Sequence, residues 1–362
     1  MYKLVAIDLD GTLLNSYGEV SEKNKEAIQK AKNKGAEIVI ASGRPISSAR
    51  SYACEVGADN YIICGNGSVL YDMKNEQIIY DKFIERQKAL QIIKICEENS
   101  IFFNIYTEKL TISKSLNYNI LFYNNENKNV PEDKKTNITI IDNIYKYVEE
   151  NPDLQVLKIT VCDESKIIFD SIIRKLREVK NVDVLDLQHM ARKYIKLGTE
   201  EKKVEYYYTE ITSKDVDKWG AIEKLADRLQ INKEEIMAIG DNMNDKRMVE
   251  NAGLGVMMEN CAPYMKDIPP SLARATPIFS PDTDCIIAET IGILAEYFGS
   301  SPFLNFTNGV FNDTFSGIQF SVVKFGNNKN SLNVLETSSN IFAIFFNPFF
   351  KYNFINLEFL NI

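Results

Sequence analysis

Short apolar runs alternate with longer amphipathic segments along the first eighty or so residues. Ala27, Ile28 and Ala31 recur at the spacing of one helical face, and they follow Ser21, a residue type that caps helices. Short continuous apolar runs are typical of strands buried on both faces. The predicted elements are strands over residues 4–9, 36–41 and 61–64, a helix between Ser21 and Gly35, and a helix between Pro45 and Gly57. This order predicts an α/β fold with a parallel sheet.

The pattern changes between residues 83 and 208. A helix ending near Glu98 is followed by asparagine-rich loops and by β-rich pieces at 101–106 and 156–161, which predicts an inserted second domain. The strand and helix alternation then resumes, with a helix over 217–229, a strand over 236–239, a helix through Met248, a strand at 255–257 and a closing helix over 282–298. We therefore expect a core built from 1–82 and 209–298, an insert at 83–208 and a separate tail at 299–362.

The end of the chain differs in composition from the rest. Residues 301–362 hold 13 of the 20 phenylalanines and 12 asparagines, but only three acidic and three basic side chains. So little charge is unusual for a solvated domain surface. Clustered aromatic residues can mark an interaction or membrane-surface segment. We favour the simpler interpretation, a tail outside the main fold that is disordered, aggregation-prone or a product of how the gene was read.

Composition narrows the classes of function. A net charge of −8 provides no broad cationic surface, so non-specific nucleic-acid binding is not expected. The six cysteines are scattered without a Cys-x-x-Cys pair, and His189 is the only histidine, which argues against disulfide frameworks and multi-histidine metal sites. Because no long apolar segment is present, we expect a cytoplasmic protein without stable membrane insertion. The oligomeric state is not encoded in any pattern that we recognise.

Two carboxylates lie at the end of the first predicted strand. Asp8 and Asp10 are two residues apart, so they point to the same side of an extended chain, and Gly11 allows a sharp turn directly after them. In an open α/β sheet this edge is where ligands bind. A pair of like charges so close together needs a cation or a proton. Capping of an ordinary Asp-Gly turn is the alternative explanation.

Three further segments carry polar groups at equivalent positions. Ser42, Gly43 and Arg44 follow the second strand at a helix start, where an anion site or an ordinary helix cap can form. Residues 240–245 contain carboxylates and carboxamides, whose oxygen atoms select hard cations such as Mg²⁺. Lys218 stands at the start of a helix, the unfavourable end for a cation, so it is either placed to meet an anion or solvated among its charged neighbours.

Taken together, these four segments resemble the motifs of the haloacid dehalogenase superfamily of phosphohydrolases, in its Cof-type branch. The resemblance covers about residues 1–298, and the turn at 65–67 resembles a further signature that borders the site in this family. Family members usually have glycine directly after the lysine, whereas this chain has Trp219, which either narrows the substrate entrance or packs beneath the cap. The segment 268–281 and the tail also depart from the family pattern.

The resemblance implies a doubly wound, parallel-sheet, Rossmann-like core with an inserted α/β cap. It also implies a Mg²⁺-dependent phosphatase that hydrolyses small phosphate monoesters, either sugar phosphates or phosphorylated cofactors. Asp8 would be the nucleophile that forms an aspartyl-phosphate, and Asp10 the general acid and base. The metal ligands it implies are Asp8, the backbone carbonyl of Asp10, Asp241 and, in support, Asp245. The phosphate-binding groups it implies are Ser42, the Gly43 backbone N–H, Lys218 and Asn244.

Two other functions fit the sequence. A mutase-type phosphotransferase that acts on sugars would use the same nucleophile, and Asp10 does not separate it from a hydrolase. A non-catalytic sensor or scaffold for phosphorylated ligands is suggested by the unusual tail and Trp219. However, a binding protein has no need of the whole set of acidic residues together with Lys218.

Overall fold

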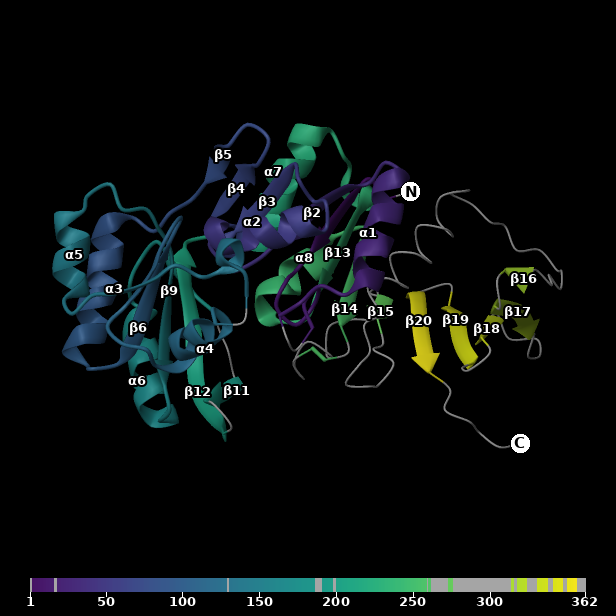
Figure 1. The fold of residues 1–362 in the computed structure, drawn as a ribbon. Helices are drawn as coiled ribbons and strands as arrows, with labels where there is room; N and C mark the ends of the chain where they lie inside the picture. The colour runs from purple at the N-terminus through teal and green to yellow at the C-terminus, as the bar shows by residue number, and fades with distance from the viewer. Residues whose placement is uncertain are drawn as a thin grey trace.

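The structure is a computed structural model. It describes residues 2–15, 18–128, 130–185, 191–197, 200–258, 260–261, 273–275, 314–315, 318–323, 331–337, 341–347 and 350–356, and describes the backbone alone at 191–197, 200–202 and beyond residue 261. The described helices and strands form three sheets and their covering helices (Figure 1).

The first sheet has eight strands in the order β15-β14-β13-β1-β2-β3-β4-β5. Its strands from β15 to β3 are parallel, and β4 and β5 extend the sheet in antiparallel fashion. The bounds are β1 Leu4–Ile7, β2 Glu37–Ala41, β3 Tyr61–Cys64, β4 Val69–Asp72, β5 Gln77–Asp81, β13 Ile236–Gly240, β14 Leu254–Met258 and β15 Ala273–Ala275. The reversal at β4 follows a short turn of 3₁₀ type, η1 (Gly65–Gly67).

Helices cover both faces of this sheet because alternate strand residues point to opposite sides. On one face, Ile7 and Ile40 pack in a cluster with the buried residues of two helices, α1 (Glu22–Asn33) and α2 (Ile46–Glu55). On the other face, Ala6 and Val39 pack with α7 (Lys218–Leu229) and α8 (Lys246–Asn251). The sheet is therefore doubly wound, and the predicted α/β fold class is confirmed.

The predicted elements of this part match the structure closely. Ser21 caps α1, accepting a hydrogen bond from the Asn24 backbone N–H. Asp217 caps α7 in the same way, accepting from the Gly220 backbone N–H. The third predicted strand has the bounds of β3, and the other predicted strands differ from the observed ones by one or two residues at their ends. The closing helix predicted over 282–298 lies outside the described residues.

A second sheet is formed by the chain between β5 and β13. Its strand order is β10-β12-β9-β6-β7-β8, with β11 paired to β12. The strands are β6 Phe102–Thr107, β7 Thr111–Ser113, β8 Ile138–Ile140, β9 Val156–Asp163, β10 Val182–Val184, β11 Ala191–Leu197 and β12 Glu200–Ser213. The helices of this part are α3 Arg86–Glu98, α4 Tyr118–Glu126, α5 Ile144–Glu150 and α6 Lys166–Leu176, with the 3₁₀ turn η2 Glu132–Lys134. Two further 3₁₀ turns, η3 Lys233–Glu235 and η4 Met243–Asp245, lie before and after β13 of the first sheet.

The second sheet has one apolar and one polar face. Helices α3, α5 and α6 pack on the apolar face against residues such as Phe103, Ile159 and Val161. Strand β12 belongs to this sheet as far as Ser213, so strand pairing carries the second sheet beyond residue 208. Figure 1 shows this sheet and its helices beside the first sheet. The division of the chain into a core and a cap, with the boundaries given above, remains a prediction.

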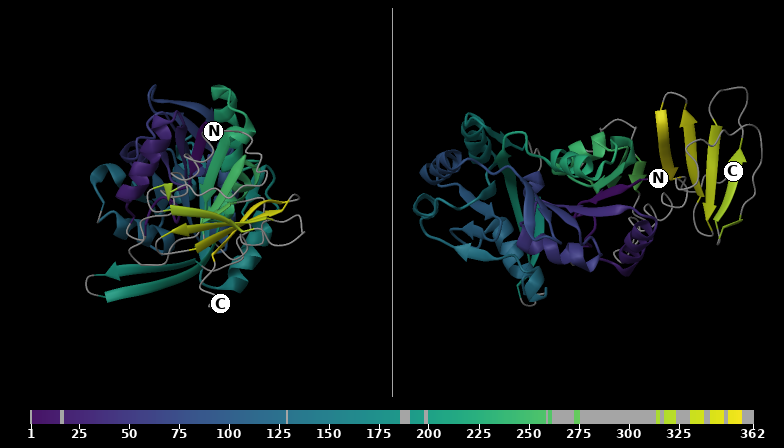
Figure 2. Two further views of the ribbon diagram at one scale, coloured as in Figure 1. Left: turned by 90° about the vertical axis from the view of Figure 1, so that its right-hand side faces the viewer. Right: turned by 90° about the horizontal axis from the view of Figure 1, so that it is seen from above.

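The tail contributes strands with a sheet of their own. β16 Thr314–Phe315, β17 Ile318–Val323, β18 Ser331–Thr337, β19 Ile341–Asn347 and β20 Phe350–Asn356 pair as an antiparallel sheet in sequence order. Figure 2 shows these strands in yellow, and β20 lies next to β15 of the first sheet. Among the described residues, no disulfide links the cysteines, and no helix combines the length and apolar character needed to cross a membrane.

Trp219 belongs to the core of the first sheet. Its side chain is 3% exposed and packs with Leu4, Ile222 and Met248, while the Lys233 ammonium lies 5.8 Å from the centre of its ring. The expectation that it narrows a substrate entrance or packs beneath a cap is therefore wrong. The second residue of an amphipathic helix faces the sheet here, so the indole is buried.

We expect Trp219→Ala to lower the free energy of unfolding by about 3–5 kcal/mol, because it leaves a cavity in a buried cluster. Trp219→Phe keeps most of the buried surface and should cost clearly less. Urea unfolding of the two variants and the unchanged protein measures both effects. Equal stability of all three would show that the indole is not packed in this core.

Candidate functional site

Predicted site residues gather at one edge of the first sheet. Asp8 follows β1, Ser42 follows β2 and Asp241 follows β13. These three strands are neighbours and parallel, so their carboxyl ends meet at the same edge. The parallel strand order therefore brings Asp8 and Ser42 from near the start of the chain into one site with Asp241, about 200 residues later.

A buried lysine joins two of the carboxylates. The Lys218 ammonium donates to Asp8 Oδ1 at 2.5 Å and to Asp245 Oδ1 at 2.6 Å, and the side chains of Lys218 and Asp245 are fully buried. Lys218 is thus not a solvated surface residue. It is the first residue of α7, so the start of this helix carries its charge into the site.

The turn at 65–67 holds the start of α7 close to the sheet. Gly67 has φ of +98°, and a Cβ at this position would lie 2.1 Å from the carbonyl oxygen of Asp217. Only glycine tolerates both this conformation and this approach. The turn therefore fixes the position of the backbone from which Lys218 reaches Asp8.

Burial dominates the electrostatics of the site. Desolvation, followed by the charge of Asp245, raises the pKa of Asp8 to about 7, although Lys218 opposes this shift. Desolvation and the charges of Asp8 and Asp245 also raise the pKa of Asp241 well above its usual value. Burial by itself would lower the pKa of Lys218, but Asp245 and Asp8 raise it above the usual value. One lysine does not balance these acids, so the site favours a further cation.

The acids are arranged as a set of metal ligands. One oxygen from each of Asp8, Asp241 and Asp245 lies within 4.8 Å of the others. Gly11 has φ of +87°, and a Cβ there would lie 2.4 Å from Asp241 Oδ2, so glycine permits the approach of Asp241. A set of carboxylate oxygens suits Mg²⁺ or another hard cation. The residues present fit this metal.

Asp10 binds a different cation from Asp8. Its two oxygens accept hydrogen bonds from Arg44 Nε at 2.9 Å and Arg44 Nη2 at 2.7 Å. Arg44 is 3% exposed and also donates to Glu126 Oε1 of α4 at 3.1 Å. Its guanidinium lies 5.3 Å and 5.8 Å from the ring centres of Tyr52 and Tyr123. The spacing of two residues predicts that Asp8 and Asp10 point to the same side. The turn at Gly11 instead directs the Asp10 side chain, which is half exposed, toward the buried Arg44.

The remaining predicted residues lie around Asn66. Ser42 is fully buried, and its Oγ accepts a hydrogen bond from the Arg44 backbone N–H. Asn244 Nδ2 donates to Asn66 Oδ1 at 3.1 Å. A Cβ on Gly43 would lie 2.7 Å from the same oxygen. The turn that the sequence singles out as a bordering signature therefore joins the second and fourth motifs.

Two residues of the second sheet, Lys158 and Glu210, also border the candidate site, and the sequence did not predict them. Lys158 of β9 forms a salt bridge with Glu210 of β12, and Asn66 Nδ2 donates to Glu210 Oε2 at 2.5 Å. A Cβ on Gly43 would lie 3.0 Å from Lys158 Nζ. A lone lysine or glutamate in a strand pattern gives no sequence signal, because only strand pairing and the approach of the two sheets bring them here.

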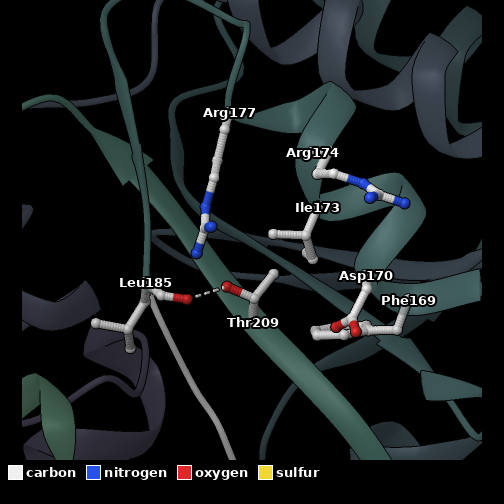
Figure 3. A pocket seen from close by; sticks show the side chains of 7 residues that line it. All are labelled: Phe169, Asp170, Ile173, Arg174, Arg177, Leu185 and Thr209. Atoms are coloured by element: carbon white, nitrogen blue, oxygen red, sulfur yellow. Dashed lines mark hydrogen bonds between the residues drawn. The ribbon is translucent and has the colours of Figure 1, made fainter. Parts of the chain in front are cut away.

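A separate pocket of about 170 Å³ lies between α6 and the edge of the second sheet (Figure 3). It contains none of the predicted site residues. Its lining residues are Phe169, Asp170, Ile173, Arg174, Arg177, Leu185 and Thr209.

Comparison with known proteins assigns this chain to a family. A sequence model of the haloacid dehalogenase-like hydrolases matches residues 5–271. The chain belongs to the haloacid dehalogenase-like hydrolase family. Its resemblance to this family, and its assignment as an enzyme of the phosphatase type, are thereby confirmed.

Several bacterial relatives match most of their own length. Phosphatase YwpJ of Bacillus subtilis is 27% identical over 281 residues, covering 74% of this chain and 92% of the relative. The 5-amino-6-(5-phospho-D-ribitylamino)uracil phosphatase YcsE of the same organism is 25% identical over 267 residues, covering 73% and 87%. The pyridoxal phosphate phosphatase YbhA of Escherichia coli is 24% identical over 291 residues, covering 80% and 97%.

Solved structures share the fold. A haloacid dehalogenase-like hydrolase from Bacillus subtilis superimposes with a TM-score of 0.64 at 24% identity, covering 80% of this chain and 98% of that one. The subclass IIB sugar phosphatase BT4131 gives a TM-score of 0.59 at 20% identity, covering 82% and 99%. At these identities the likeness concerns the fold alone.

The raised pKa of Asp8 predicts how stability depends on pH and metal. The metal-free protein should lose stability as pH rises from about 4 to 7, because the folded state holds a proton that the unfolded state has released. Mg²⁺ should raise the melting temperature at pH 7.5 and much less at pH 5, since its ligands must be deprotonated. Thermal unfolding with Mg²⁺ or EDTA measures both.

Asp241→Asn should remove most of the Mg²⁺ effect, whereas Asp153→Asn, at an exposed position, should keep it. An equal response of both variants to Mg²⁺ would place the ion elsewhere.

Proposed function

We propose that this protein is a Mg²⁺-dependent phosphatase that hydrolyses small phosphate monoesters through an aspartyl-phosphate. The observation that carries the proposal is the buried Asp8 carboxylate, held by Lys218 beside Asp241 and Asp245. A carboxylate fixed in this way is oriented as a nucleophile, and the surrounding acids are placed to hold a cation that makes attack on an anionic phosphate possible.

In the first step, an oxygen of Asp8 attacks phosphorus and the bond from phosphorus to the ester oxygen breaks. Asp10 gives its proton to the leaving alkoxide. Its half-exposed position, two residues after the nucleophile, supports this role, and Arg44 orients its carboxyl group. The products of this step are the free alcohol and Asp8 phosphorylated on oxygen.

In the second step, water attacks the same phosphorus atom while Asp10 takes a proton from it. The bond from phosphorus to Asp8 breaks, so inorganic phosphate leaves and the carboxylate is restored. The second half reverses the proton flow of the first, so one carboxyl group serves both halves.

The groups that bind the transferred phosphate are Ser42, the Gly43 backbone N–H, Lys218 and Asn244. All lie at the edge that Asp8 occupies, and Lys218 already contacts Asp8. Hydrogen-bond donors fixed before reaction stabilise the charge that spreads over the phosphoryl oxygens in the transition state.

The metal would be held by Asp8, the Asp10 backbone carbonyl, Asp241 and Asp245. When bound, Mg²⁺ neutralises charge between the attacking carboxylate and the phosphate. Asp245 also accepts hydrogen bonds from the backbone N–H groups of Asp241 and Asn242, which fixes the loop that carries Asp241.

We infer that residues 83–208 act as a cap over a core of 1–82 and 209–298. Contacts of Glu126 and Lys158 with the site support this assignment, because they come from the second sheet and its helices. A cap that covers the site excludes water and contacts the leaving group. Substrates are then small phosphorylated metabolites of the cytoplasm, sugar phosphates or phosphorylated cofactors, in keeping with the substrates for which several similar proteins are named.

We expect Asp8→Asn to lower phosphate release by a factor on the order of 10⁴ or more, since it keeps the shape and removes the nucleophile. EDTA should abolish release by the unchanged protein, and Mg²⁺ should restore it. Asp153→Asn is the matched control at an exposed acid. Release is measured as inorganic phosphate from 4-nitrophenyl phosphate and from a panel of sugar phosphates.

Each alternative function gives a different result. Phosphate that appears on an added sugar acceptor, with no free inorganic phosphate, would indicate a phosphotransferase. Binding of phosphate esters without turnover would indicate a sensor. Undiminished release by Asp8→Asn would refute the nucleophile itself.

A further inference from the structure

The pocket between α6 and the edge of the second sheet lies apart from the candidate active site. It is lined by residues at the end of α6, by Leu185, which follows β10, and by Thr209 of β12. Thr209 and Glu210 are neighbours on one strand, so their side chains point to opposite faces of the sheet. Glu210 accepts a hydrogen bond from Asn66 and borders the candidate site. The sheet therefore separates the pocket from that site.

One part of the pocket lining is apolar. Phe169 and Ile173 are buried and belong to the apolar cluster beneath α6. Figure 3 shows Leu185 across the pocket from these two side chains. The volume of about 170 Å³ is close to the roughly 150 Å³ of an apolar cavity that accommodates benzene. The pocket therefore has room for about one six-membered ring.

Two guanidinium groups line the same pocket. Arg174 lies in the last turn of α6, and Arg177 follows directly after the helix. Figure 3 shows the Arg177 side chain extending toward Leu185 and Thr209. Within the part of the chain that the structure describes, Arg174 has no carboxylate partner. The pocket therefore offers positively charged N–H donors to an anion.

Asp170, the one acid among the lining residues, limits the charge of that anion. Its carboxylate accepts a hydrogen bond from the Lys166 ammonium at 2.6 Å, so Lys166 compensates its charge and leaves the arginines to a ligand. Repulsion between Asp170 and a ligand grows with the charge of the ligand, so a phosphate dianion meets twice the repulsion of a carboxylate. A single carboxylate also matches the planar, forked donors of arginine.

Hydrogen bonds hold the sheet side of the pocket in place. The Thr209 hydroxyl donates to the Leu185 carbonyl oxygen at 2.6 Å, and the Leu185 backbone N–H donates to the Glu210 carbonyl oxygen at 2.9 Å. Both backbone groups of Leu185 are therefore bound to β12. Because this wall is fixed before a ligand enters, binding does not have to order it.

We propose that this pocket binds a small monocarboxylate that carries one six-membered ring, of the size and charge of benzoate. The carboxylate pairs with Arg174 and Arg177, and the ring packs against Ile173, Phe169 and Leu185. The site is a second one, on the other face of the sheet from the candidate active site. The proposal does not depend on the reaction proposed above.

Calorimetric titration of the full-length protein with benzoate tests the proposal. We expect one benzoate to bind per chain. Benzamide has the same ring without the charge and should bind about tenfold more weakly or worse, because charged hydrogen bonds are lost. Acetate keeps the charge but buries no ring, so it should also bind at least about tenfold more weakly. Absence of benzoate binding, or equal affinity for benzoate and acetate, would overturn the proposal.

Substitutions on α6 and directly after it locate the bound carboxylate. Arg174→Gln and Arg177→Gln should each weaken benzoate binding about tenfold. Lys175→Gln is the matched control, because Lys175 lies between the two arginines but outside the lining, and its ammonium donates to Asn99 Oδ1 at 2.7 Å. All three positions are exposed, so the variants should fold, which thermal unfolding checks. An equal loss of affinity in all three would indicate general attraction to a positive helix end and overturn the site.

Competition with inorganic phosphate separates the pocket from the candidate active site. Phosphate should leave the affinity for benzoate unchanged, and Arg177→Gln should leave phosphate release from 4-nitrophenyl phosphate unchanged. Displacement of benzoate by phosphate, with normal benzoate affinity in Arg177→Gln, would place benzoate in the candidate active site and refute the proposal. The benzoate titrations give the same answer whether or not the protein hydrolyses phosphate esters, so failure of the proposed function is distinguishable from failure of this site.

Discussion

The ammonium group of Lys218 holds the candidate site together. It lies between the carboxylates of Asp8 and Asp245, and all three groups are removed from water. Buried charges are costly unless they are paired and hydrogen-bonded, so this contact fixes where α7 begins and where the loop after β13 lies. The partners are 210 and 27 residues away in the sequence, and the parallel order of β1 and β13 brings them together.

Arg44 repeats this arrangement at the mouth of the site. It also pairs with two carboxylates, but one of them, Glu126, comes from α4 beside the second sheet. The group that orients Asp10 is therefore also a contact between the two sheets and their helices. Because the charge of Arg44 is shared, any movement of α4 relative to the first sheet changes the surroundings of Asp10.

The two faces of the second sheet contact different parts of the protein. The apolar face packs three helices and supplies the core of this part of the chain. On the polar face, Lys158 and Glu210 lie beside the candidate site. Because successive side chains of a strand point to opposite faces, the residues of one face do not restrict those of the other. Relatives of this chain named as phosphatases act on esters as different as a ribitylaminouracil phosphate and pyridoxal phosphate. Under the function proposed above, substitutions on the polar face would change which leaving group is accepted and would leave the apolar core unchanged.

The α/β fold, the main elements and the motif residues could be predicted from the sequence, because apolar periodicity, caps and short motifs act over a few neighbouring positions. The Ser21 cap and the turn at 65–67 were both predicted in this way. Tertiary structure alone decided that Trp219 is a core residue, that Asp10 pairs with Arg44, and that Lys158 and Glu210 border the site. These depend on contacts between strands and helices far apart in the chain, and a single lysine, glutamate or tryptophan looks the same in a local pattern wherever its side chain ends.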